Sequence, residues 1–128
     1  MTDEKLYELC KKYGRQALLW RQKFVGLLPE VYKRRLYEKK GFGSIFEFAF
    51  KLAGLSEKQV RLVLNLEQKF EDKPVLRRML IDGEVSANKL VRIASVATRE
   101  NEEELAAVVK TLPKSAVDTY ARDIRNGL

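Results

Sequence analysis

Four side chains that could bind nucleic acid share one face of a predicted helix. They are spaced three and four residues apart, so a helix beginning near residue 57 would place them side by side: Lys58, Arg61, Asn65 and Gln68. Lysine and arginine bind phosphates, and arginine and amide side chains form hydrogen bonds with base edges. This spacing therefore predicts a polar helix face that contacts both the backbone and the bases of a nucleic acid.

The residues before this face have the signals of two helices joined by a tight turn. Ser44 and Glu47 form a capping box that opens one helix, and Gly54 suits its C-terminal cap. Ser56 and Gln59 form a second capping box that opens the next helix. A turn of this length is typical of a helix-turn-helix, whose second helix enters the major groove of DNA. Because free amides at a helix start attract phosphate, we expect Ser56 to belong to the same site.

An αα-hairpin that only packs into a core is the alternative interpretation of the same segment. Leu62 and Leu66 widen the apolar surface of the second helix to more than half its girth. Phe50 lies where a small residue usually allows the two helices to pack closely, and Glu57 would repel phosphate. The sequence pattern leaves both interpretations open.

The net charge of +7 is concentrated near the start of the 128-residue chain. Residues 1–41 carry a balance of +6, residues 42–96 carry +2, and residues 97–128 carry −1. The densest basic segment, YKRRLYEKK, contains five cations: Lys33, Arg34, Arg35, Lys39 and Lys40. One-sided positive charge is expected of a protein that binds a polyanion, and a solvated helix face is the alternative. Five phosphate contacts would give a log–log salt slope of about −4 to −5.

A long N-terminal helix is predicted to start at Thr2 and to end at Pro29. Apolar residues follow a 4-3-4-3-4-3 spacing along it: Leu6, Cys10, Tyr13, Ala17, Trp20, Phe24 and Leu27. We expect this stripe to pack into the core of the domain. A homodimer through the helix of residues 6–27 is the second interpretation. A basic helix on a membrane surface is a third and weaker one.

Helical periodicity continues along the rest of the chain, and no alternating run indicates a strand. Phe46 and Phe50 share a face and are expected in the core. Further helices are predicted over 74–81, 87–97, 98–111 and after Pro113. The fold class is therefore all-α, a multi-helix bundle of about eight helices containing a helix-turn-helix. We expect one domain, 1–128, made of a basic N-terminal helical pair (1–40), a helix-turn-helix core (44–97) and a C-terminal helical pair (98–128).

Several functional classes are disfavoured by the composition. The chain has no histidine, so it lacks the commonest general base and transition-metal ligand. Cys10 is the single cysteine and has no imidazole to activate it. We therefore expect no catalytic site, no metal and no cofactor. No run of apolar residues is long enough to span a membrane, and a single cysteine suits a reducing compartment, so we expect a cytoplasmic protein.

An ordered set of segments resembles the helical region that precedes the nuclease domain in bacterial HNH endonuclease-like proteins. The set covers about residues 36–105 and comprises GFGSIFEF, GLSEKQV, a proline-led helix ending in DGEVS, and a helix closing at VATREN. The part from GLS to DGEVS is also similar to the helix-turn-helix region of ParB-type partition proteins. This resemblance implies a DNA-binding module in which Lys58, Gln59, Arg61 and Asn65 form the recognition face. It also implies that the segment after Gly83 contributes Ser86, Asn88 and Lys89 to the site.

One departure from that family concerns the nuclease motif, which needs histidines that this chain lacks. Either the nuclease part belongs to a longer protein of which this is the N-terminal part, or the chain is a relative that binds without cutting. We expect a DNA-binding helix-turn-helix domain with a targeting or regulatory role and double-stranded DNA as its partner. The alternative is a helical protein-interaction or oligomerisation module that binds no nucleic acid.

Overall fold

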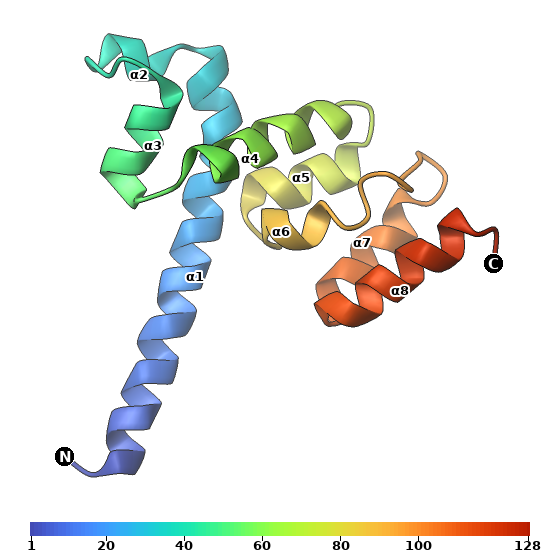
Figure 1. Cartoon of the computed structure of the whole chain (residues 1–128), viewed down its shortest axis with the longest axis horizontal. Coiled ribbons are helices and arrows are strands. Elements are labelled where there is room, and N and C mark those ends of the chain that lie inside the picture. Colours follow the sequence, from blue (N-terminus) through green and yellow to red (C-terminus); the bar gives the residue numbers. More distant parts are fainter.

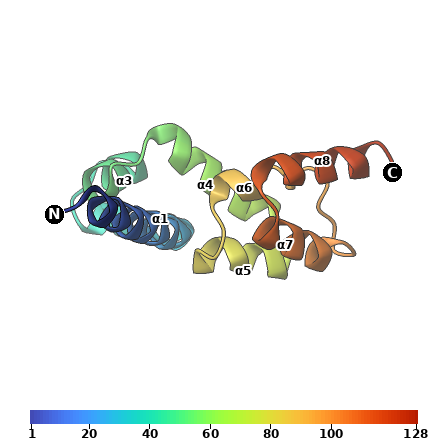
Figure 2. The same ribbon diagram turned by 90° about the horizontal axis from the view of Figure 1, so that it is seen from below.

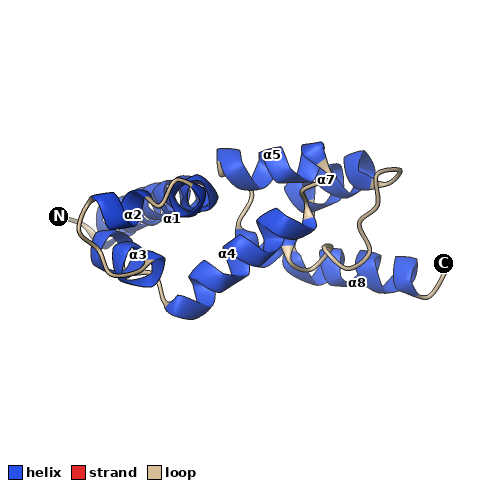
Figure 3. Ribbon diagram, turned by 90° about the horizontal axis from the view of Figure 1, so that it is seen from above, coloured by secondary structure: helices blue, strands red, loops and turns tan.

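The computed structural model describes residues 1–128 and consists entirely of helices joined by short loops (Figures 1 and 3). This confirms the predicted all-α class. The eight helices are α1 (Asp3–Lys33), α2 (Leu36–Lys39), α3 (Ile45–Ala53), α4 (Glu57–Lys69), α5 (Pro74–Asp82), α6 (Ala87–Leu90), α7 (Glu102–Thr111) and α8 (Lys114–Arg125). None of them combines the length and the apolar character needed to cross a lipid bilayer.

Helix α1 is longer than the sequence pattern predicts. Thr2 caps its start as expected, because its side chain accepts a hydrogen bond from the amide of Lys5. The prediction that Pro29 ends the helix is wrong, since α1 continues to Lys33. Proline removes one helical hydrogen bond, but Val25 and Leu28 beside it are buried against neighbouring helices. That tertiary packing carries the helix through the proline.

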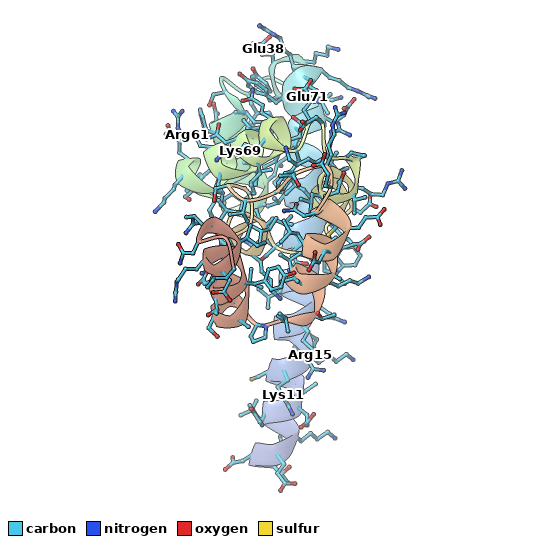
Figure 4. All side chains as sticks on the ribbon, turned by 90° about the vertical axis from the view of Figure 1, so that its right-hand side faces the viewer. Lys11, Arg15, Glu38, Arg61, Lys69 and Glu71 are labelled. Atoms are coloured by element: carbon cyan, nitrogen blue, oxygen red, sulfur yellow. The ribbon has the colours of Figure 1, made fainter.

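The first 18 of the 31 residues of α1 project from the body of the molecule as an arm, which we define as residues 3–20 (Figures 1 and 4). Nearly all of its side chains are exposed, including Cys10, and Leu6, Tyr13 and Trp20 are 52%, 59% and 65% exposed. The expectation that this stripe packs into the core is therefore wrong for the arm. The spacing identified which residues share a face, but no other part of this chain covers that face.

Two hydrophobic clusters form the body, and α4 passes from one to the other (Figure 3). The first joins the end of α1 to α3 and the start of α4, around Leu28, Phe48 and Val60. The second joins the end of α4 to α5, α6, α7 and α8, around Phe70 and Leu90. The α7–α8 pair consequently lies at the opposite end of the molecule from α3 (Figure 2). Helix α4 is thus held along its length by core contacts on one side.

The inward face of α3 differs from the predicted one. Ile45, Phe48 and Ala49 are buried, and the ring of Phe48 packs edge-on against Phe42 at 5.1 Å between centroids. Phe50 is 65% exposed, so its predicted place in the core is wrong. The inward face is set by where α1 and α4 lie, and the spacing of three phenylalanines in one short helix does not specify it.

Helices α1 and α5 approach each other through two glycines. A Cβ atom on Gly26 would lie 2.2 Å from the backbone oxygen of Ile81. Gly83, at the end of α5, has a φ of +70°, and a Cβ there would lie 2.8 Å from the backbone nitrogen of Lys23. Both positions therefore require glycine, Gly83 for its backbone conformation as well as for space.

Two predicted helix boundaries in the second half of the chain are wrong. The helix predicted over 87–97 ends as α6 at Leu90 and continues as turns. The helix predicted from Thr98 begins at Glu102, because Thr98 and Asn101 bond reciprocally and close a separate turn before it. Glu102 is buried and accepts hydrogen bonds from the amides of Val75 and Leu76, at 2.8 and 3.3 Å. A side chain of α7 thus caps the start of α5.

Candidate nucleic-acid interface

The turn between α3 and α4 is fixed by the capping interactions that the sequence predicts. Gly54 ends α3 with a φ of +66°. The Ser56 hydroxyl accepts from the Gln59 amide at 3.2 Å, and the Gln59 side chain accepts from the Ser56 amide at 3.1 Å. Leu55 and Val60 are fully buried beneath the turn, as a hydrophobic staple requires. The predicted second capping box is confirmed, and it fixes the direction in which α4 leaves the turn.

The opening of α3 is capped in a different way from the predicted box. The Ser44 hydroxyl accepts from the Glu47 amide at 3.1 Å, but the Glu47 carboxylate accepts from the Gly43 amide at 2.9 Å rather than from Ser44. The Gly43 hydrogen bond and the Lys51 ammonium both hold the pKa of Glu47 below its ordinary value. Glu47 is therefore a charged cap at neutral pH.

The outer face of α4 remains open to solvent along its whole length. Its four polar side chains, Lys58, Arg61, Asn65 and Gln68, are all exposed. Val60, Val63 and Leu66 are buried on the opposite side, and Leu62 is half-buried at the boundary. Leu62 and Leu66, which widen the apolar surface of α4, thus belong to one broad face that packs against the body. We call the four exposed residues the α4 face.

An open depression beside the α4 face gathers six of the fourteen predicted site residues. It is lined from the turn, from α4 and from α6 by Ser56, Glu57, Lys58, Gln59, Arg61, Leu62, Asn65 and Asn88. Asn88 was expected from the resemblance alone, and it lies 23 positions beyond Asn65 in the chain. Gln68 and Lys89 do not line this depression. We call it the polar depression.

A second hollow, the neighbouring groove, adjoins the polar depression and shares Gln59, Leu62 and Asn88 with it. Its only charged lining residues are Arg21 of α1 and Lys114 of α8. The guanidinium of Arg21 donates to the Gln59 side chain at 2.8 Å, which joins α1 to the start of α4. Sequence reasoning missed both cations.

A signal for Arg21 does exist in the sequence. Leu18, Arg21, Val25 and Leu28 recur at three- and four-residue intervals, so a helix places Arg21 on the side of α1 that packs against the body. Lys114 has no comparable signal, because only the fold brings the start of α8 to this groove.

Arg61 is held in place by two neighbours. Its guanidinium bonds the Glu57 carboxylate at 2.6 and 3.1 Å, and it lies over the Phe46 ring at 4.8 Å from the centroid. An exposed pair of this kind contributes at most about 1 kcal/mol, so a phosphate can compete for the guanidinium. Arg61 projects outward from the side of the body, away from the arm (Figure 4). Lys58 forms no ion pair and is the freer of the two cations.

The basic segment of residues 33–40 lies apart from the polar depression, at the end of the molecule where Figure 4 labels Glu38. The second helix of the predicted N-terminal pair (1–40) is not continuous, because Arg35 has a φ of +52° and separates α1 from α2. Three of its cations are engaged by carboxylates: Lys33 by Glu67, Arg34 by Glu30 and Arg35 by Glu38. Lys39 and Lys40 form no ion pair.

Glu67 is a buried carboxylate that ties this segment to the core. It lies 2.7 Å from the Lys33 ammonium and 3.1 Å from the Arg77 guanidinium. Burial alone would raise the pKa of Glu67, but the hydrogen bonds from Lys33 and Arg77 outweigh it and hold the pKa below its ordinary value. Lys33 thereby joins α1 to α4, which gives it a structural role that its place in a basic run did not indicate.

Comparison with models of known families, with curated proteins and with solved structures finds no match for this chain. No three acidic or thiol side chains gather as ligands for a metal ion. The function is therefore inferred from the geometry of the α4 face and its surroundings.

Proposed function

We propose that this domain binds double-stranded DNA as a targeting or regulatory module, with α3 and α4 as a helix-turn-helix. The observation that carries the proposal is the polar depression, in which exposed cations and amides of α4 meet Asn88 of α6. Asn65 and Asn88 would contact base edges, and Lys58 and Arg61 would contact phosphates. The resemblance to the helical region of HNH endonuclease-like proteins supports the same function.

The neighbouring groove extends this proposed contact surface. Arg21 and Lys114 add two cations beside the start of α4, with no acidic residue in the groove lining. Four cations around the two hollows would give a log–log salt slope of about −3 to −4, since each phosphate contact contributes about −0.9. Lys39 and Lys40 lie outside this surface and would steepen the slope only if the duplex reaches them.

A charge-matched pair of variants tests the site. Lys58→Glu with Arg61→Glu removes the two phosphate-binding cations of the α4 face, and Arg122→Glu with Arg125→Glu removes two exposed cations of α8. Each double variant lowers the net charge of +7 by four, to +3, so long-range attraction is equal in both. The assay is fluorescence anisotropy with a labelled duplex of about two helical turns, with circular dichroism to check the fold.

We expect the α4 double variant to lose at least tenfold in affinity and to flatten the salt slope by about 2, because two phosphate contacts disappear. The α8 double variant should keep the slope and most of the affinity. Equal losses in the two variants would refute the α4 site and indicate a response to net charge alone. An absence of duplex binding by the unaltered chain would favour the alternative, a helical module that binds protein.

A further inference from the structure

The arm carries an apolar stripe that nothing in this chain covers. Leu6, Tyr13 and Trp20 are all more than half exposed, and Leu27 continues the stripe along the body at 60% exposure. Most helices in proteins take their stability from the tertiary packing of an apolar face, and the arm has no such packing. The arm's own side-chain contacts add little, since Lys11 pairs only with Glu8 and lies over the Tyr7 ring. A partner along the stripe would supply the missing stabilisation.

The spacing of the stripe favours another helix as that partner. From Leu6 to Leu27 the apolar positions average 3.5 residues, through three consecutive 4-3 steps. A repeat of 3.5 keeps the stripe facing a second helix that winds around the first, whereas packing on a globular surface follows the 3.6-residue turn. The stripe therefore has the period of a two-helix coil.

Charge along α1 identifies which helix would fit. Residues 3–8 contain three acidic residues and one lysine, and residues 11–23 contain five cations and no acid. Two parallel copies would place these five cations beside five others. Two antiparallel copies in which Tyr13 lies opposite Ala17 would place Lys11, Lys12, Arg21 and Lys23 level with uncharged residues of the second copy, and the two helix dipoles would point in opposite directions. An antiparallel second copy thus avoids most of the cation–cation pairing that a parallel copy would create.

Side-chain size along the stripe favours the same antiparallel arrangement. When Tyr13 lies opposite Ala17 of a second copy, Cys10 lies opposite Trp20, so in these two layers a large side chain faces a small one. A parallel register would instead place Trp20 against Trp20 and Ala17 against Ala17. That pairing would alternate crowded layers with empty ones.

We propose that the arm is a self-association site, through which two copies of this chain form an antiparallel dimer. If each of the five stripe residues of the arm buries on the order of 100 Å², the two arms bury roughly 1,000 Å², which is about the lower limit for a specific interface. The inference does not depend on DNA binding, because its tests change only residues of the arm.

Analytical ultracentrifugation of the full chain tests the dimer with a matched pair of substitutions. Tyr13→Glu places a charge in the stripe, and Leu19→Glu places one about 120° around the same helix, also at an exposed position. Tyr13→Glu should raise the dimer dissociation constant at least tenfold, and Leu19→Glu should change it much less. A chain that stays monomeric at high concentration, forms larger assemblies, or responds equally to both changes would overturn the proposal.

Cys10 tests the orientation because it is the only cysteine. In a parallel dimer the two Cys10 side chains would meet, and mild oxidation would link them. In the antiparallel register they lie about 15 Å apart along the axis, too far for a disulfide. We expect Trp20→Cys to permit a covalent dimer between position 20 and Cys10, seen on a non-reducing gel. A covalent dimer through Cys10 alone, or none in the Trp20→Cys variant, would overturn the orientation.

Discussion

Replacing Gly26 with alanine places a methyl group where α1 passes closest to α5. The new Cβ would lie 2.2 Å from the oxygen of Ile81 and 2.8 Å from the oxygen of Leu80. Both are backbone atoms inside α5, so no side-chain rotation relieves the clash. Because unstrained contacts between such atoms need about 3.5 Å, the two helices would have to separate by about 1 Å.

The expected loss follows from two opposing effects. Overpacking of a rigid contact costs about 1–3 kcal/mol, and here it falls at the upper end because both neighbours are backbone. Alanine returns up to about 1 kcal/mol through its higher helix propensity. The net destabilisation is about 2 kcal/mol, which lowers the Tm of a domain of this size by roughly 7 °C.

Gly14→Ala is the matched control in the same helix. No atom lies within 4 Å of the methyl group that this change would add, and the position is exposed. Thermal unfolding followed by circular dichroism should show more helical signal for Gly14→Ala without a lower Tm. Equal Tm values for Gly26→Ala and the unaltered chain would refute the close packing of α1 on α5.

Two further stability predictions concern buried carboxylates. The pKa of Glu67 is lowered in the folded state, so its ion pairs stabilise the domain above the ordinary pKa of about 4.5 and lose that contribution as pH falls through the lower folded pKa. Glu67→Gln should therefore lower the free energy of unfolding by about 1–2 kcal/mol at pH 7 and by less at pH 3, measured by urea unfolding. An equal loss at both pH values would contradict the ion pairs with Lys33 and Arg77. Glu102→Ala should cost about 1–3 kcal/mol by the same assay, because it leaves two amides at the start of α5 without an acceptor; a change below about 0.5 kcal/mol would contradict that capping role.

Local signals predicted the middle of the molecule well. The boundaries of α3 and α4 follow from Ser44, Gly54 and the Ser56–Gln59 box, all of which act within a few residues of where they stand. The exposed α4 face also follows from its spacing. The helix predicted after Ser86 is shorter than expected, because turns replace helix beyond Leu90. Packing rather than helix propensity decides the backbone conformation there.

Features that depend on distant neighbours could not be predicted in the same way. The apolar stripe of α1 indicated a packing face, but not that its partner is missing from this chain. Pro29 indicated a helix end, but the burial of Val25 and Leu28 against neighbouring helices carries α1 past it. Contacts with residues 26 or more positions away in the sequence give Arg21, Glu67 and Glu102 their roles. No local pattern encodes such contacts.

Binding of the unaltered chain to a DNA duplex across a salt series tests the proposed function most directly. The measurement compares a duplex with single-stranded DNA and RNA of the same sequence, and the slope of log affinity against log salt counts the phosphate contacts. The α4 site predicts tightest binding to the duplex with a slope of about −3 to −4, from the four cations around the polar depression and the neighbouring groove. Tighter binding to a single strand, or no binding to the duplex at low salt, would contradict the proposal.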